Sequence, residues 1–231
     1  TVLGYVVSTI IALIQLFLTK QKVKPVFKNC LEPQMIKLIF SYGLPSFVMN
    51  ALGAFTVNFA NMFLVRYSDT AVAFFGAYFK VQQLIFMTVN GLILGCLPII
   101  RFNYRAKEYG RLKQANKSGT IIATVMMIVG MLLVLIFPKE ILFLFSASEE
   151  MCAFGVPAMR IMSLGFVFSG FSAMIATYEQ ATDSIMPGVV VQLLRQGVLL
   201  VPVIWLLNSA VQMTGIWLAF PITEFVTFLV A

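Results

Sequence analysis

The chain has 231 residues, of which 60% are hydrophobic and only 11% are charged. Its mean hydropathy of +0.95 lies outside the range of ordinary soluble domains, which excludes that class of protein. Sixteen basic and nine acidic residues give a net charge of +7, and the sequence contains no histidine. These values predict an integral membrane protein.

Seven apolar segments follow one another, each close to the roughly 20 residues that a membrane helix needs. They are too continuously apolar for an outer-membrane barrel, whose strands alternate apolar and polar residues over about ten positions. The fold class that we predict is therefore all-α, a polytopic membrane helix bundle of about seven transmembrane helices. The segments cover residues 1–18, 38–65, 71–98, 119–137, 154–178, 186–206 and 211–231.

The chain opens within one apolar segment, without a methionine, and stops within another. The first segment lacks the charged leader and the small-residue cleavage site of a secretory signal. We therefore expect the sequence to be a piece of a longer membrane protein.

The basic residues predict the orientation of the chain. Eleven of the sixteen follow the first or the third apolar segment, and the positive-inside rule places both regions in the cytoplasm. The net charge then needs no nucleic acid as a partner, and these bases can contact anionic membrane lipids. The eleven are Lys20, Lys22, Lys24, Lys28, Lys37, Arg101, Arg105, Lys107, Arg111, Lys113 and Lys117.

The residue types that bind metals and cofactors are scarce. Cys30, Cys96 and Cys152 fall in a cytoplasmic loop, a span and an outer region, so they cannot pair across the membrane. Without histidine or a cysteine cluster, the usual zinc, iron and haem sites have no ligand set. No glycine-rich phosphate loop follows a strand. We expect no metal, no cofactor and no enzyme activity.

The second segment carries a polar stripe. Gly43 and Pro45 loosen its start, and Asn50, Asn58 and Asn61 share roughly a third of the helix circumference. Two readings stay open. The asparagines either make hydrogen bonds between helices, worth about 0.6 kcal/mol per contact, or form one wall of a hydrated central cavity.

The third segment carries a charge inside an apolar helix. Lys80 and Gln83 fall on the same narrow arc as Gly91, and this arc should face protein or water because a charge in hydrocarbon is costly. Gly91 and Gly95 lie on one face, which favours either tight packing or a hinge. We expect the helix to break at Pro98, before the basic region.

Two further charges lie deep in the last segments. Arg195 lies within the sixth span, and Glu224 lies near the middle of the seventh, after Pro221. An ionisable residue at such depth is a candidate functional group. Glu224 is either a proton or cation site or the partner of a base such as Arg195 or Lys80.

Residues 39–86 and 91–115 resemble the start of the second half of a multidrug and toxic compound extrusion (MATE) transporter. Residues 178–207 and 214–231 resemble its last helices. The resemblance implies that 1–18 is the last helix of an N-terminal lobe. It also implies that 19–37 is a basic cytoplasmic loop between lobes. Residues 38–231 would then be the C-terminal six-helix lobe of a twelve-helix protein. The motifs that match are Gly43 to Pro45, Lys80, Gly91 to Pro98, Asn103, Arg195 and Gly215 to Glu224.

The family resemblance implies an antiporter of the cytoplasmic (inner) membrane. It would export organic cations or drugs in exchange for H⁺ or Na⁺, by rocking one lobe against the other, which is missing here. Some members have acidic residues in the helices that match segments 38–65 and 154–178. This chain has Asn50, Asn58 and Asn61 in the first of these and no carboxylate deep in the second, so coupling would use Glu224 or a carboxylate of the missing lobe. We predict a central cavity between segments 38–65, 71–98, 186–206 and 211–231. Its candidate lining residues are Asn50, Asn58, Asn61, Lys80, Gln83, Arg195 and Glu224, and the candidate hinge or packing residues are Gly43, Pro45, Gly91, Gly95, Pro98 and Pro221.

Three other functions are compatible with a membrane bundle. A lipid-linked sugar or oligosaccharide flippase of the same superfamily predicts a strongly cationic cavity, and only Lys80 and Arg195 lie inside the spans here. A membrane enzyme needs clustered acids, histidines or a serine beside a base, and the sequence shows no such cluster. A noncatalytic scaffold has little use for charges and asparagines inside its helices.

Overall fold

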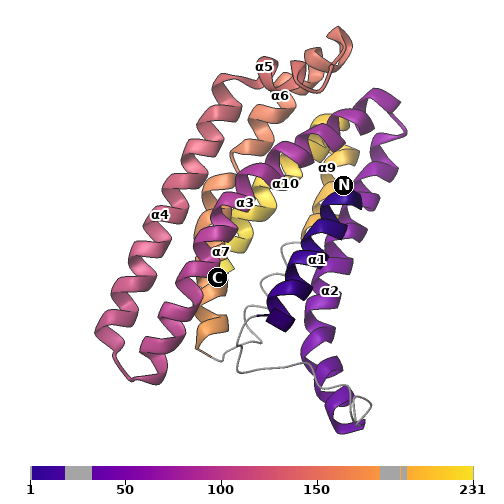
Figure 1. Cartoon of the computed structure of the whole chain (residues 1–231). Helices are drawn as coiled ribbons and strands as arrows, with labels where there is room; N and C mark the ends of the chain where they lie inside the picture. Colours follow the sequence, from indigo (N-terminus) through magenta and orange to yellow (C-terminus); the bar gives the residue numbers. More distant parts are fainter. Residues whose placement is uncertain (1, 19–32, 183–192, 194–196, 231) are drawn as a thin grey trace. The chain divides into compact units, whose positions relative to one another are not determined.

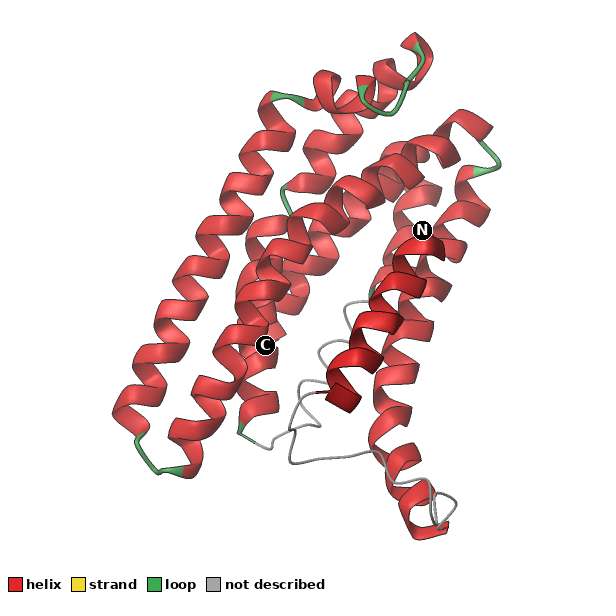
Figure 2. Cartoon of the chain, in the orientation of Figure 1, coloured by secondary structure: helices red, strands yellow, loops and turns green. Residues whose placement is uncertain are grey.

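The computed structural model describes residues 2–18, 33–182, 193 and 197–230. Within those ranges the regular structure is helical and contains no strand, which confirms the predicted all-α class (Figure 2). The chain divides into two compact units, Thr1–Leu44 and Pro45–Ala231. We describe each unit by itself.

The first unit contains α1 (Val2–Leu18) and the start of α2 (Pro33–Leu64). The described side chains of α1 are exposed, and its stretch from Gly4 to Gln15 is apolar. The proline at the start of α2 fits there because the first turn of a helix leaves its N–H groups unbonded. α2 therefore begins inside the predicted loop 19–37, and it continues without a break through Gly43 and Pro45 into the second unit.

Helices α3, α4 and α7 of the second unit lie side by side, and α10 packs on α6, α7 and α9 (Figure 1). Four described stretches are long and apolar enough to cross a membrane, and α1, the end of α2 and α9 are shorter apolar helices. The predicted bundle of about seven membrane helices is thus confirmed. The helices of this unit after α2 are α3 (Asp69–Arg105), α4 (Tyr109–Ile136), α5 (Pro138–Phe143), α6 (Glu149–Ser163), α7 (Phe166–Ala181), α9 (Leu200–Val211) and α10 (Met213–Val230).

Two glycines of α4 set its register against α3. A Cβ atom at Gly130 would lie 2.5 Å from Cγ2 of Ile85, and one at Gly119 would lie 3.1 Å from Sγ of Cys96. The two contacts are eleven residues apart on both helices, in opposite chain directions. The antiparallel pair therefore keeps one register over three helical turns, with small residues where the backbones approach.

An aromatic cluster joins the start of α3 to α10. The rings of Phe74 and Trp217 have centroids 5.2 Å apart at 80°, and Phe75 lies 5.7 Å from Phe220. Phe74, Phe75 and Trp217 are all buried. Edge-to-face pairs of this kind contribute about 0.5–1.5 kcal/mol beyond their buried area, so the cluster fixes the position of α10 beside α3.

The predicted break at Pro98 is wrong, because α3 continues through this proline to Arg105. A proline inside a helix removes the hydrogen bond to the carbonyl four residues earlier. That residue is Leu94, which is 72% exposed, so the helix packing around it is not disturbed. The helix ends further on, where Lys107 takes a left-handed conformation (φ 59°).

The span predicted at 154–178 lies within the membrane stretch Glu149–Ala181, and the structure divides this stretch into the helices α6 and α7. The N–H of Leu164 donates to Ile161 O and that of Gly165 donates to Met162 O, both at 3.3 Å. These three-residue turns tighten the chain between the helices. A buried joint therefore interrupts the membrane stretch Glu149–Ala181.

The start of α3 depends on a serine cap. Ser68 precedes the helix, and its Oγ accepts a hydrogen bond of 3.0 Å from the N–H of Ala71. We expect Ser68→Ala to lower the free energy of unfolding by about 0.5–2 kcal/mol. The N–H of Ala71 would then keep only the carbonyl oxygen of residue 68, at 3.1 Å, as its acceptor. Ser68→Asp should keep the cap and most of the stability. Thermal unfolding of the detergent-purified protein measures both, and equal midpoints for Ser68→Ala and the wild type would contradict the role of the cap.

Candidate functional site

Glu224 is the predicted site residue that the structure places inside the helix bundle. It lies within α10, one turn after Pro221, and α10 continues past both residues to Val230. The side chain is partly buried, and its Oε2 atom is fully buried. A carboxylate in an apolar helix is costly to keep charged, so its surroundings decide what it does.

The joint between α6 and α7 lies directly against Glu224. A Cβ atom at Gly165 would lie 3.2 Å from Cγ of Glu224 and 3.2 Å from Cα of Pro221. A larger residue at position 165 would displace the glutamate, so glycine fits this close approach. Because α7 begins at Phe166, the Glu224 side chain lies beside the start of a helix, where the dipole favours a negative charge.

Helix α3 contributes Tyr78 to the surroundings of Glu224. Tyr78 is 1% exposed, and the centroid of its ring lies 6.5 Å from that of Phe166, the first residue of α7. Helices α3, α7 and α10 therefore meet around one carboxyl group and one phenol.

Buried hydroxyl groups lie on the same helices. The hydroxyl of Ser169 donates to Gly165 O at 3.1 Å, and the hydroxyl of Thr223 donates to Ala219 O at 2.7 Å. Each hydroxyl therefore donates its proton to a backbone carbonyl four residues earlier. Thr227 Oγ1 is buried, and within the described part of the chain it has no hydrogen-bond partner. A carboxyl group with a buried oxygen atom in an apolar helix can hold a proton or a small cation.

The other predicted lining residues do not surround Glu224 in the described structure. The side chains of Asn58, Lys80 and Gln83 are exposed, and Asn61 is partly buried. The Oδ1 atom of Asn61 is buried and accepts no hydrogen bond from the residues that the structure describes. Arg195 and the side chain of Asn50 lie outside the described residues, so the central cavity and the pairing of Arg195 with Glu224 stay predictions.

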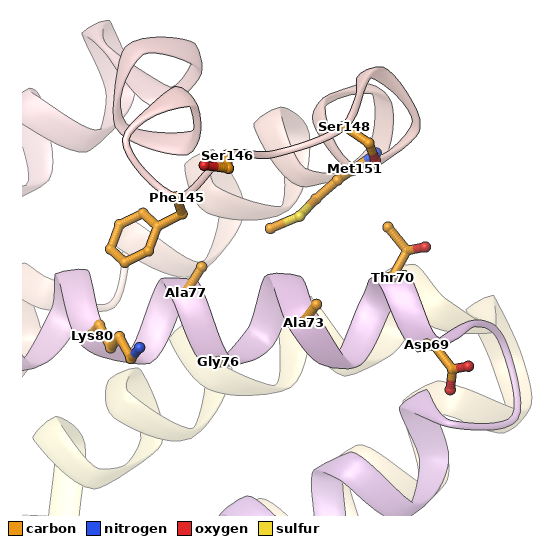
Figure 3. Close-up of a pocket in the computed structure, with 10 residues that line it drawn as sticks. All are labelled: Asp69, Thr70, Ala73, Gly76, Ala77, Lys80, Phe145, Ser146, Ser148 and Met151. Atoms are coloured by element: carbon orange, nitrogen blue, oxygen red, sulfur yellow. The ribbon is translucent and has the colours of Figure 1, made fainter.

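Lys80 lines a cavity of about 610 Å³ at the start of α3 (Figure 3). Lys80 and Asp69 lie toward opposite ends of the row of α3 residues drawn there, and the α5–α6 loop faces them. Ser146 in this loop has φ 53°, a conformation that few residues other than glycine adopt. No pattern in the sequence predicted this cavity. Its lining is Asp69, Thr70, Ala73, Gly76, Ala77, Lys80, Phe145, Ser146, Ser148 and Met151.

The candidate hinge and packing residues lie in unbroken helices. Gly91 and Gly95 are exposed on α3, and no described atom lies within 4 Å of a Cβ built at either. The tight packing predicted for this pair therefore has no partner among the described residues. The choice between packing and a hinge stays open.

The MatE family model matches residues 45–206. The chain belongs to this family. The predicted membership of the multidrug and toxic compound extrusion transporters is thereby confirmed, and with it the character of a multi-pass membrane protein.

Curated relatives of this MatE chain include multidrug export proteins of two bacteria. MepA of Staphylococcus aureus is 26% identical over 183 residues, which are 79% of this chain and 40% of MepA. MepA of Staphylococcus haemolyticus is 28% identical over 182 residues, with the same coverage of 79% and 40%. The chain thus spans less than half the length of the curated relatives that it matches.

Solved structures share the fold of this MatE chain. An outward-facing multidrug resistance MATE family transporter of the MOP superfamily superposes with a TM-score of 0.84 at 18% identity. A MOP superfamily transporter from Pyrococcus furiosus, described as having a binding pocket of reverse polarity, gives the same TM-score and identity. Both alignments cover 99% of this chain and 52% of the solved chain.

Proposed function

We propose that this chain is the C-terminal half of a cation-coupled antiporter that exports organic cations or drugs across the cytoplasmic membrane, with Glu224 as its coupling carboxylate. One observation carries the assignment of Glu224. Among the described carboxylates it is the one deep inside an apolar helix, whereas the others lie at helix ends, in short α5 or in turns. These others are Asp69, Glu108, Glu140, Glu149, Glu150 and Glu179.

The proposed coupling uses the change of charge on Glu224. When the carboxyl group holds H⁺ or Na⁺, the site is neutral and costs little inside the membrane; when it is empty, the charge favours an organic cation nearby. The helix dipole at the start of α7 stabilises the negative charge of the empty carboxylate. A carboxylate at the junction of broken and continuous helices is a common arrangement for ion coupling in transporters.

The joint at Gly165 offers a place for movement. Its three-residue turns interrupt the helical hydrogen bonding between α6 and α7, and the glycine backbone contacts the Glu224 side chain. A change in the charge or position of Glu224 therefore acts on the joint directly. We propose that this contact links ion binding to the tilt of α7.

The proposed partner of this half is an N-terminal lobe of the same protein. Lys80, Gln83, Gly91 and Gly95 are exposed on one face of α3, which they share with the exposed apolar side chains of Leu84, Met87 and Leu94. Such a face is poorly suited to lipid because charge and glycine backbone offer little contact to acyl chains. The face is instead suited to a water-filled cleft between two lobes.

A double substitution tests this proposed face. We expect Gly91→Leu/Gly95→Leu to reduce transport by the full-length protein about tenfold or more, because bulky apolar side chains would fill the cleft proposed between the lobes. Gly110→Leu is the matched control, since Gly110 is also exposed with no described atom near its Cβ position. Efflux from proteoliposomes measures the effect. If the double variant transports as well as Gly110→Leu, this face of α3 does not line the cleft between the lobes.

The proposed activity itself is tested with the full-length wild type in proteoliposomes. Efflux of a fluorescent organic cation is followed under an imposed H⁺ gradient and then under a Na⁺ gradient. Efflux that depends on one gradient supports antiport and identifies the coupling ion. Efflux under neither gradient contradicts antiport and favours a flippase or scaffold of the same fold.

A further inference from the structure

The turn between α3 and α4 concentrates positive charge. Six bases and a single acid, Glu108, lie within residues 101–117, a surplus of five positive charges. All seven side chains are exposed. We call this region the basic tip, and its six bases are Arg101, Arg105, Lys107, Arg111, Lys113 and Lys117.

Hydrogen bonds hold the basic tip in one conformation. The N–H of Ala106 donates to Phe102 O at 3.0 Å, and the N–H of Glu108 donates to Asn103 O at 2.9 Å. Asn103 is buried, and its Nδ2 donates to Ile99 O at 2.8 Å. The bases therefore project from two joined helix ends rather than from a loose loop.

The register of the two helices places bases at matching heights. Cys96 faces Gly119, so five residues toward the turn Arg101 lies level with Gln114 and next to the level of Lys113. Arg105 lies level with Gly110, next to Arg111, by the same register. Four of the six charges are thus arranged in two layers around the helix pair.

The length of α3 carries the basic tip beyond the hydrocarbon of a bilayer. Its 37 residues span about 55 Å at 1.5 Å per residue, against a hydrocarbon core of about 30 Å. The first polar turns of α4 extend equally far. Phe102 is 72% exposed and Tyr109 is 61% exposed beside these bases. Aromatic rings in this position are typical of the level of lipid headgroups.

We propose that the basic tip is a docking surface for anionic phospholipid headgroups of the cytoplasmic leaflet. Arginine guanidinium groups bind phosphate through paired hydrogen bonds, and lysine adds point charges. The exposed rings of Phe102 and Tyr109 favour a lipid surface over a soluble polyanion, because they gain contact with acyl chains and headgroups only there. This proposal concerns lipid recognition and does not depend on what the protein transports.

Lipid binding by the full-length protein tests this surface. Retention of phosphatidylglycerol and of phosphatidylcholine on the purified protein is measured by native mass spectrometry over a lipid titration. We expect selective retention of phosphatidylglycerol by the wild type. In Lys113→Gln/Lys117→Gln its apparent affinity should fall roughly 10- to 30-fold, since each base near an anionic surface contributes roughly a fivefold effect.

A matched control removes the same charge at the other end of the unit. Arg66→Gln/Lys139→Gln changes two exposed bases in the regions predicted to face outward, and phosphatidylglycerol affinity should stay at the wild-type value. Equal losses in both double variants would overturn the proposal, since the effect would then be one of net charge. Equal retention of the two lipids by the wild type, or displacement of phosphatidylglycerol by inorganic phosphate, would overturn it as well.

Discussion

Glu224→Gln in the full-length protein is expected to reduce gradient-driven efflux of an organic cation about tenfold or more. Glutamine keeps the size of the side chain and its contact with Gly165, but it cannot exchange H⁺ or Na⁺. The variant should therefore insert and fold normally, while imposed gradients no longer drive export. Efflux from proteoliposomes, normalised to the amount of inserted protein, measures the loss.

Two further variants make the Glu224 result specific. Glu150→Gln removes an exposed carboxylate at the start of α6 and should leave efflux unchanged. Glu224→Asp keeps the charge on a shorter side chain and should retain part of the coupled efflux. Wild-type efflux in Glu224→Gln would move the coupling carboxylate to the absent lobe.

Gly215→Ala is expected to have the largest effect on stability. A Cβ atom there would overlap the carbonyl group of Leu207, a backbone group of α9 that cannot rotate away. The two helices would have to separate at their closest point, which should cost about 3 kcal/mol or more of the free energy of unfolding. A large drop in the thermal midpoint of the detergent-purified protein, or loss of monodisperse protein, would show this effect.

The control for this substitution is Gly110→Ala. Gly110 lies in the first turn of α4 with open space at its Cβ position, so alanine should be neutral or slightly stabilising. An unfolding midpoint for Gly215→Ala equal to that of Gly110→Ala would contradict the close approach of α9 and α10.

The membrane helices were predictable because their apolar character is local in the sequence. Long apolar runs specify spans directly, and the serine before Asp69 caps α3 as a helix start requires. The positions at which a membrane helix is interrupted were predicted less well. Pro98 lies in a helix that tolerates it because Leu94 is exposed, whereas Leu164 and Gly165 separate α6 from α7 inside the predicted span 154–178.

The surroundings of Glu224 were not predictable from one sequence. The depth of its charge identified the residue, but Gly165 and Tyr78 lie 59 and 146 positions earlier in the chain. The helices that surround Glu224 are selected by packing over the whole unit. This packing leaves no pattern in the sequence near Glu224. The cavity beside Lys80 was missed for the same reason, since the residues facing α3 come from the α5–α6 loop.

Ion release on substrate binding tests the role of Glu224 most directly. An organic cation is added to the purified full-length protein in weakly buffered solution, and the released H⁺ is measured with a pH indicator and the released Na⁺ with a sodium electrode. The proposed role of Glu224 predicts release of one of these ions by the wild type and by Glu150→Gln, and none by Glu224→Gln. Equal release by Glu224→Gln and the wild type would contradict it.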